Sequence, residues 1–441
     1  MNYNKHVFIL CCVFLSVLIL FSVAIEKYPN QFQFFKKISI ISDIIHRPER
    51  KKIVAKPSKD TISNNSVQNS YLIPHRIGIC DQTNSTAVLF HLKQRIDALR
   101  QSKKGKIRIA WFGDSMIEGD LITQTIRKIL QDTLGGHHAV GFVAPKTVSS
   151  NNRITARSNI TGDFTTYQFH KTNQQFPLFF SGYVYSISNG VCTVTDNTQD
   201  SNDVQQNIYK YLVCGKGSES EIDVNGRPVL ISPSKFINYI LIDSSKSKSL
   251  QCGIKNEQLP VYGFSLEMQD GIVVDNFSFR GITGTEYNKI DTNLLLELNQ
   301  SGIYDLIVFQ FGVNLLFKPN DKEYTYYQRL MTPVLSKFKR CMLTTDFLII
   351  STFDRAFKYD QGWESAIGID TLVATQYRLS CNYQFNFYNL FHTMGGRGTI
   401  VRWADSSTTL ANHDYIHPNH KGASLIGATI AHDLLTAINK K

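Results

Sequence analysis

The chain has 441 residues, of which 42% are hydrophobic and 12% aromatic. This composition is typical of a globular protein and excludes a collagen-like or wholly disordered chain, while the length favours a catalytic core with a smaller module. The formal net charge is +11, but residues 26–60 carry nine Lys or Arg against four acidic residues, so nearly half of the excess lies in one short stretch. Charge concentrated in this way argues against a nucleic-acid-binding surface.

An uncharged hydrophobic segment runs from Val7 to Ile25, behind a short polar start. Such a segment at this position predicts export, and its length reaches that of a membrane-spanning helix, about 17 to 25 residues. We expect a retained membrane anchor, although Ser22-Val23-Ala24 also fits a signal-peptide cleavage site. Residues 26–85, rich in Lys, Asn and Ser, are expected to form a basic tether. These features predict a protein of the cell envelope, in the periplasm or on its outer face.

Two of the eight cysteines, Cys11 and Cys12, lie in this hydrophobic segment. No CxxC or Cys/His spacing of a metal site occurs among the others. Up to three disulfides or a set of buried small side chains are both compatible with the pattern. The six remaining cysteines are Cys80, Cys192, Cys214, Cys252, Cys341 and Cys381.

Three short, continuously apolar runs predict strands at 107–112, 304–311 and 345–352. Hydrophobic residues at helical spacing follow the first run until Gly135-Gly136, and further helices are predicted at 322–340 and 423–438. Continuous rather than alternating apolar residues indicate strands covered on both faces. The pattern therefore predicts a parallel α/β sheet.

Residues 149–261 have a different sequence pattern from the predicted α/β part, because short runs rich in Val, Tyr, Ile and Thr alternate there with Gly and Asn. This pattern predicts a β-rich, sandwich-like insert, with hairpin turns at Asn189-Gly190 and Asn225-Gly226. We expect this division in chain order: signal anchor or signal peptide at 1–25, tether at 26–85, catalytic domain at 86–148, insert with carbohydrate binding as a candidate role at 149–261, catalytic domain again at 262–441.

A serine and an Asp-x-x-His pair are the candidate catalytic residues. Ser115 follows the first strand in Gly113-Asp114-Ser115, where a strand-to-helix turn can expose its hydroxyl above the sheet. Asp414 and His417 stand just before the last helix, and one turn can bring the carboxylate to the imidazole. Each motif alone fits an ordinary turn or helix cap. His413 and His420 are neighbours that an assignment could confuse with His417.

Two further residues follow predicted strands and can donate hydrogen bonds to an oxyanion. Gly281 comes after the VVDNFSF run and Asn314 after YDLIVFQF. With the backbone N–H of Ser115 they would form a three-donor oxyanion hole. Gly284 is close enough to be confused with Gly281, and either glycine alone fits a simple turn.

Four blocks occur in order: FGDSMIEGD, FRGITG, QFGVN and HDYIHPNHKG. With them the chain resembles the SGNH hydrolase (GDSL-like esterase) superfamily over about residues 105–148 and 262–435. The resemblance implies a three-layer, flavodoxin-like α/β fold with a mainly parallel sheet. It also implies Ser115 as nucleophile, His417 as base, Asp414 as its orienting partner, and Gly281 and Asn314 as oxyanion donors.

The stretches TMGGRGTIVRW (393–403) and GFVAP resemble the branch that contains peptidoglycan O-acetylesterases, some of which carry a β-rich carbohydrate-binding insert. The chain departs from that branch at Met116, where histidine often stands; this leaves the triad intact and weakens the substrate assignment. Glu118 and Asp120 could shape the acceptor side of the site, but we expect them to open the following helix with favourable charge.

The sequence thus predicts a serine esterase that removes O-acetyl or other short acyl groups from an envelope polysaccharide or peptidoglycan. It needs no metal or organic cofactor, its partners are the acetylated glycan and the membrane, and nucleic acid is not expected. One alternative is an O-acetyltransferase that passes the acyl group from the same serine to a glycan. The other is an inactive esterase core that serves as a glycan-binding envelope protein.

Overall fold

The computed structural model describes residues 88–135, 137–171, 173–199 and 205–440, together with 13, 17, 73, 76–80 and 203. The chain divides into Met1–Ser63 and Asn64–Lys441, and the fold below belongs to the second unit. Apart from residues 13 and 17, the predicted anchor lies outside the described residues, and so does most of the predicted tether. Within the described part, no helix is both long and apolar enough to cross a bilayer.

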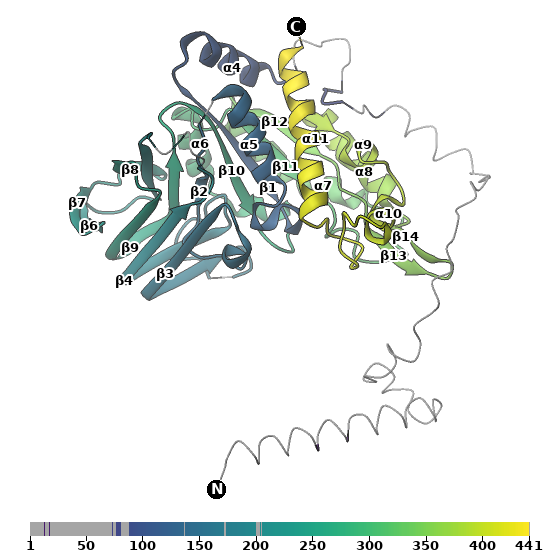
Figure 1. The fold of residues 1–441 in the computed structure, drawn as a ribbon, viewed down its shortest axis with the longest axis horizontal. Coiled ribbons are helices and arrows are strands. Elements are labelled where there is room, and N and C mark those ends of the chain that lie inside the picture. Colours follow the sequence, from purple (N-terminus) through teal and green to yellow (C-terminus); the bar gives the residue numbers. More distant parts are fainter. Residues whose placement is uncertain are drawn as a thin grey trace. The chain divides into compact units, whose positions relative to one another are not determined.

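A five-stranded parallel sheet forms the centre of the α/β core, in the order β10-β1-β11-β12-β15 (Figure 1). All neighbouring strands in it run in the same direction. The predicted strands at 107–112, 304–311 and 345–352 are confirmed as β1, β11 and β12. The bounds are β1 Lys106–Gly113, β10 Gly271–Ser278, β11 Leu306–Gln310, β12 Asp346–Ile350 and β15 Asn386–Tyr388.

Helices cover both faces of this sheet, which gives three layers (Figure 1). One face packs against α4 (Phe90–Ser102), α5 (Thr123–Leu134) and α11 (His420–Asn439). The other packs against α6 (Thr292–Gln300), α7 (Tyr326–Cys341) and α8 (Ile369–Tyr383). Side chains alternate between the faces, so Trp111 of β1 belongs to the first core and Phe112 to the second. The predicted three-layer fold is confirmed.

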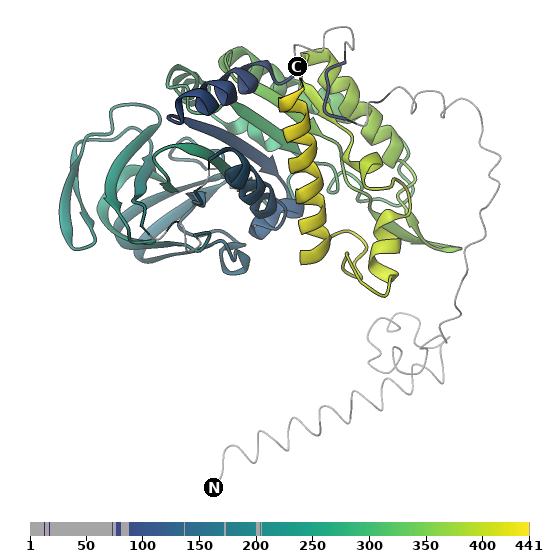
Figure 2. The same ribbon diagram turned by 45° about the horizontal axis from the view of Figure 1, so that its top comes forward.

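The predicted β-rich insert is an eight-stranded antiparallel sheet built around the long strand β9, which pairs with β4, β5, β6 and β2 (Figure 2). It reaches beyond the expected 149–261 at both ends. Its strands are β2 Gly141–Val143, β3 Ala156–Gln168, β4 Tyr183–Asp196, β5 Ile208–Cys214, β6 Ser220–Val224, β7 Arg227–Ile231, β8 Asn238–Ser245 and β9 Ser249–Glu267.

One of the two predicted hairpin turns is confirmed and the other is wrong. Asn225 and Gly226 join β6 to β7 with φ values of 53° and 80°, as a tight hairpin requires. Asn189 and Gly190 instead lie inside the single strand β4, at irregularities in its pairing with both neighbours. Because β3 and β9 pair with β4 on its two sides, the ladders override the local preference of Asn-Gly for a turn.

Insert and core share one hydrophobic interior. Phe112 of β1 stacks on Tyr287 with ring centroids 4.4 Å apart and meets Phe180 of the insert edge-on at 4.8 Å. The ring centroid of Phe142 in β2 lies 5.2 Å from that of Phe277 in β10. The antiparallel sheet is thus fused to the α/β core by packed aromatic rings.

The cysteines divide between the two alternatives that the sequence left open. Cys80 and Cys381 form a disulfide, and the adjoining Gly78 pairs with Phe387 beside the sheet. Among the cysteines that the structure describes, the four others are buried free thiols, and burial raises the pKa of Cys192 and of Cys214 to about 12. A thiol with so high a pKa is an unreactive core residue. The four are Cys192, Cys214, Cys252 and Cys341.

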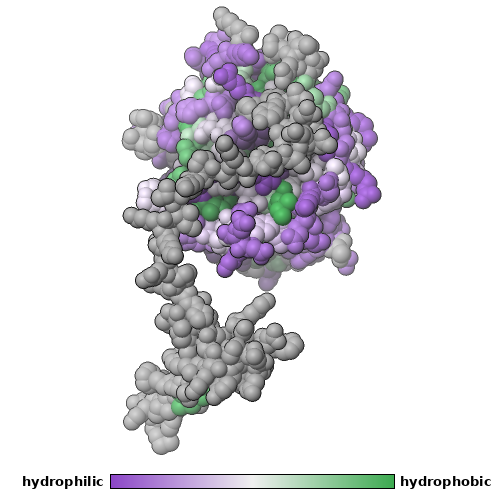
Figure 3. Space-filling model, turned by 90° about the vertical axis from the view of Figure 1, so that its right-hand side faces the viewer, coloured by the Kyte–Doolittle hydropathy of each residue, from purple (hydrophilic) through white to green (hydrophobic). Residues whose placement is uncertain are grey.

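Figure 3 views the molecule from the side on which Figure 1 shows the hairpin of β13 (Ala356–Tyr359) and β14 (Gly362–Ser365). Where described residues are visible in this view, the surface is mostly hydrophilic, and hydrophobic residues form small separate spots. Isolated apolar side chains of this kind are normal on a folded protein and define no docking patch.

Candidate active site

All four sequence blocks meet at one edge of the parallel sheet. Gly113 of β1 pairs with Ser278 of β10 on one side and with Gln310 of β11 on the other, and Gln310 pairs with Ile350 of β12. Because parallel strands end at the same edge, the loops that follow these residues converge there. Ser115, Gly281 and Asn314 come from three of those loops, and the Asp414–His417 segment comes from the loop before α11.

The segment Ser115–Asp120, called the nucleophile turn after the predicted role of Ser115, follows β1 and is held on both sides. The Asp114 carboxylate accepts a hydrogen bond from the Met116 N–H at 2.9 Å, and the Asn276 side chain donates to the Ile117 carbonyl at 2.9 Å. Asp120 ends the turn with a φ of 69°. The backbone around Ser115 is therefore fixed by polar contacts as well as by packing.

Asp114 is 1% exposed, and its Oδ2 has no hydrogen-bond partner in the described structure. Burial raises the pKa of this carboxyl to about 7, against the opposing effects of the Met116 N–H and of His417. A buried carboxyl with an unpaired oxygen favours the neutral form.

Asp414, His417 and Ser115 form a continuous hydrogen-bonded chain. Ser115 Oγ lies 2.8 Å from His417 Nε2, and His417 Nδ1 lies 2.7 Å from Asp414 Oδ2. Asp414 Oδ1 also accepts hydrogen bonds from the backbone N–H groups of Ile416 and His417, both at 3.0 Å. Burial opposes ionisation of Asp414, but these hydrogen bonds outweigh it and lower its pKa. An ionised Asp414 fixes the imidazole with its Nε2 facing the serine.

The loop that carries Asp414 and His417 is braced by the β13–β14 hairpin. Tyr415, with a φ of 55°, stacks on Trp363 with ring centroids 4.1 Å apart. Its carbonyl accepts a hydrogen bond from the Ala356 N–H at 3.0 Å, and its hydroxyl donates to Asp405 at 2.9 Å. These contacts hold a strained turn in the geometry that aligns the imidazole.

Gly281 and Asn314 both line the cavity at Ser115. Gly281 has a φ of 82°, and an added Cβ would meet no atom within 4 Å, so backbone conformation rather than space favours glycine there. One N–H of the Asn314 side chain donates to the Ile282 carbonyl at 2.9 Å, which leaves its second N–H for another acceptor. Gly284 packs against Phe311 and is absent from the cavity lining.

The cavity has a volume of about 610 Å³. Of the neighbouring histidines, His420 lines it beside His417, whereas His413 is two-thirds exposed and faces Asp405. The lining residues are Ser115, Met116, Glu118, Gly119, Leu121, Asn152, Arg280, Gly281, Asn314, Asn412, His417, Pro418 and His420.

The expectation that Glu118 and Asp120 open the following helix by charge is wrong. Helix α5 begins only at Thr123 and has no acidic residue in its first turn. Glu118 instead forms an ion pair with Arg280 in the cavity wall, where Nε and Nη2 of the guanidinium both donate to Glu118 Oε2, at 2.9 and 2.6 Å. Asp120 is buried in an ion pair with Arg127 at 2.6 Å, which outweighs desolvation and lowers its pKa.

Arg355, which sequence reasoning missed, links two loops of the site. Its Nη1 donates to the Val313 carbonyl at 2.7 Å, one residue before Asn314, and its charge favours ionised Asp414. Its guanidinium lies over the Phe357 ring at 4.8 Å. Arg355 and Arg280 each follow a strand of the parallel sheet by a few residues. This position after a strand was the only feature of the sequence that could have indicated that they belong to the site.

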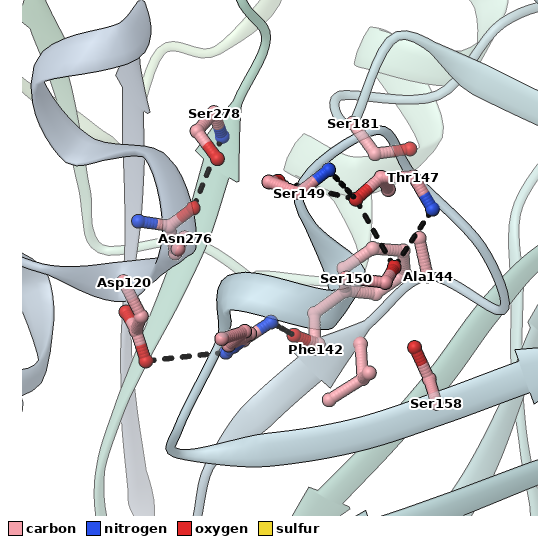
Figure 4. A pocket seen from close by; sticks show the side chains of 13 residues that line it. Asp120, Phe142, Ala144, Thr147, Ser149, Ser150, Ser158, Ser181, Asn276 and Ser278 are labelled. Carbon is pink, nitrogen blue, oxygen red and sulfur yellow. Dashed lines mark hydrogen bonds and ion pairs between the residues drawn. The ribbon is translucent and has the colours of Figure 1, made fainter. Parts of the chain in front are cut away.

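Figure 4 shows where the insert meets the nucleophile turn, around a small cavity of about 30 Å³. Asp120, Asn276 and Ser278 face it from the core, and Thr147 and Ser150 face it from the insert. Arg153 of the insert reaches Asp120 Oδ2 at 3.4 Å and the Phe142 carbonyl at 3.2 Å. The turn that bears Ser115 is thereby tied to the insert through Asp120.

This arrangement can perform nucleophilic acyl transfer. It combines a serine hydroxyl on an imidazole, a carboxylate that orients the imidazole, and hydrogen-bond donors beside the hydroxyl. Within the described residues, no group of three or more His, Cys, Asp or Glu side chains is placed to hold a metal ion.

Comparisons with known proteins agree with this fold. No family model and no curated protein matches the chain. Among solved structures, a peptidoglycan O-acetylesterase matches with a TM-score of 0.66 at 20% identity, over 80% of this chain and 97% of that one.

Two other matches have TM-scores too low to support an argument. A family two carbohydrate esterase from Cellvibrio japonicus matches with a TM-score of 0.26 at 10% identity, over 64% of this chain and 99% of its own length. A carbohydrate acetylesterase from Sinorhizobium meliloti matches at 0.25 and 11% identity, over 37% of this chain and 79% of its own. The strands, the layers and the match to the peptidoglycan O-acetylesterase together show that the chain has an SGNH hydrolase-like fold.

Proposed function

We propose that this protein is a serine esterase that removes O-acetyl or other short acyl groups from an envelope polysaccharide or peptidoglycan. The observation that carries the proposal is the hydrogen-bonded chain from Asp414 through His417 to Ser115, at 2.7 and 2.8 Å, beside a cavity of about 610 Å³. A serine hydroxyl is a weak nucleophile until a neighbouring base accepts its proton, and this geometry provides that base.

The reaction proceeds in two steps. Ser115 Oγ attacks the ester carbonyl while His417 Nε2 takes its proton; the bond to the sugar oxygen then breaks, and His417 returns the proton to that oxygen. Water next gives a proton to His417 and attacks the acyl-serine, which releases acetate and restores the Ser115 hydroxyl. Asp414 stays ionised throughout and stabilises the protonated imidazole.

The negative charge on the carbonyl oxygen needs donors that are already in place. We assign this role to the backbone N–H groups of Ser115 and Gly281 and to the free side-chain N–H of Asn314. The bond from Asn314 to Ile282 at 2.9 Å supports the assignment, because it fixes the amide plane before substrate arrives.

The glycan substrate and the envelope location are parts of the proposal with separate support. A similar fold occurs in a peptidoglycan O-acetylesterase, which makes an acetylated glycan the first substrate class to test. For the location, the support is the uncharged segment Val7–Ile25 in the sequence, which would anchor the protein in the membrane.

Acetate release from 4-nitrophenyl acetate and from O-acetylated peptidoglycan fragments tests the proposal. Wild-type protein should release acetate from both, and Ser115→Ala should reduce the rate to near background. Full activity of Ser115→Ala would refute the nucleophile. Acetylated acceptor sugars formed in place of free acetate would identify a transferase with the same acyl-serine step.

A further inference from the structure

Several polar side chains in the cavity wall have no protein partner. Asn152, Asn412 and His420 line the cavity, and within the described structure their side-chain nitrogen and oxygen atoms make no hydrogen bond or ion pair with protein. Unpaired amides and imidazoles beside a reacting centre are available to the hydroxyl and carbonyl oxygens of a substrate.

Arg280 presents a fixed donor at the same wall. Its Nε and Nη2 donate to the Glu118 carboxylate at 2.9 and 2.6 Å, whereas its Nη1 makes no hydrogen bond with protein in the described structure. The Glu118 side chain is 10% exposed and that of Arg280 is 60% exposed. The Glu118 carboxylate is therefore buried, whereas the Arg280 guanidinium is exposed to solvent, and two hydrogen bonds to the carboxylate fix the plane of the guanidinium.

Glu118 and Arg280 are both close in sequence to residues of the proposed active site. Glu118 lies three residues after Ser115 in the nucleophile turn, and Arg280 directly precedes Gly281. Because Glu118 balances the charge of Arg280, the wall offers a directed N–H group with little net positive charge. Such a donor suits a neutral oxygen, whereas an unbalanced guanidinium would attract a carboxylate.

The insert contributes to the same wall through Asn152. Gly119 has a φ of 64°, and a Cβ added to it would lie 3.3 Å from the Asn152 carbonyl oxygen. The insert backbone thus approaches the nucleophile turn closely enough to place Asn152 in the cavity. A sugar bound there would contact both the α/β core and the insert.

We propose that this wall is a subsite for an uncharged sugar ring, with Arg280 as the specificity-determining residue and Asn152 as a second contact. The inference rests on the proposed esterase function and adds to it the charge class of the substrate. Arg280 donates from Nη1 to a neutral oxygen of the sugar that carries the ester. Glu118 neutralises the guanidinium and so discriminates against sugars that carry a carboxylate.

Two probes of equal length separate neutral from anionic sugars: O-acetylated chitotetraose and O-acetylated tetragalacturonate. Acetate release from each is measured with the full chain, and 4-nitrophenyl acetate reports the chemical step. Wild type should prefer the chitotetraose probe. Arg280→Gln should lower kcat/KM for that probe about tenfold relative to 4-nitrophenyl acetate, mainly through KM, because a donor to a substrate oxygen is lost.

Glu118→Gln provides the opposite test, because it leaves Arg280 unbalanced. It should raise the kcat/KM ratio of galacturonate to chitotetraose about tenfold at low salt, and added salt should remove the gain. Equal losses on all three esters in Arg280→Gln, or an unchanged ratio in Glu118→Gln, would overturn the subsite. Absence of acetate release by wild type from every ester would instead refute the proposed function.

Discussion

Replacing Asp114 with asparagine should change how the stability of the protein depends on pH. The substitution keeps the side-chain shape and the oxygen that accepts from the Met116 N–H, but it removes the ionisable group. In the folded wild type, burial raises the pKa of Asp114 from 3.8 to about 7. The folded protein therefore keeps a proton over a pH range in which the unfolded chain has already released it.

The sign and the size follow from this difference in proton binding. The folded state binds more protons between the two pKa values, so the free energy of unfolding of wild type falls as pH rises through this window and is flat above it. A shift of about three units corresponds to about 4 kcal/mol at most. Between pH of about 5 and about 8, the same relation gives a loss of about 3 kcal/mol that the asparagine variant lacks.

Urea unfolding of both proteins at about pH 5, 6, 7 and 8 measures this effect. The free energy of unfolding of Asp114→Asn minus that of wild type should increase by about 3 kcal/mol across the series, with the increase ending near pH 7. A difference that is constant with pH would show that Asp114 ionises normally in the folded state. Burial and the unpaired Oδ2 would then not raise the pKa of Asp114 in the folded protein.

Three further substitutions test separate parts of the structure. Asn314→Ala removes a proposed oxyanion donor and should lower kcat for 4-nitrophenyl acetate about 100- to 1000-fold with little change in KM, and an unchanged kcat would contradict the role. Arg127→Met leaves Asp120 buried without its main partner and should lower the free energy of unfolding by about 3 to 5 kcal/mol in urea titrations. Cys381→Ser opens a disulfide that spans 301 residues and should cost about 2 to 5 kcal/mol, whereas Cys341→Ser, at a free thiol, serves as the control for the loss of a disulfide.

The placement of the candidate site residues beside one another could be predicted from the sequence, because each motif directly follows a strand or precedes a helix. Ser115, Gly281 and Asn314 stand just beyond the ends of apolar runs, and parallel strands bring such ends to one edge. The central strands could likewise be predicted, because burial on both faces leaves continuous apolar runs, and the long helices could be predicted from hydrophobic residues at helical spacing.

The features that could not be predicted depend on contacts between residues far apart in the sequence, which local sequence patterns do not encode. Asn189 and Gly190 favour a turn by themselves, but two neighbouring strands pair with β4 and hold them extended. The bond between Glu118 and Arg280 joins residues 162 positions apart, and it exists because β10 pairs with β1 in a particular register. The reach of Arg355 to Val313 likewise depends on the turn after β12.

The central claim is that Ser115 is a nucleophile activated by His417. Reaction with a fluorophosphonate probe tests it without knowledge of the substrate, because the probe reports an activated serine. Intact-mass measurement should show one added group on wild type, mapped by peptide analysis to Ser115. Ser115→Ala should take up none, and His417→Ala should react far more slowly. Labelling at another residue, or equal labelling of wild type and Ser115→Ala, would contradict the account.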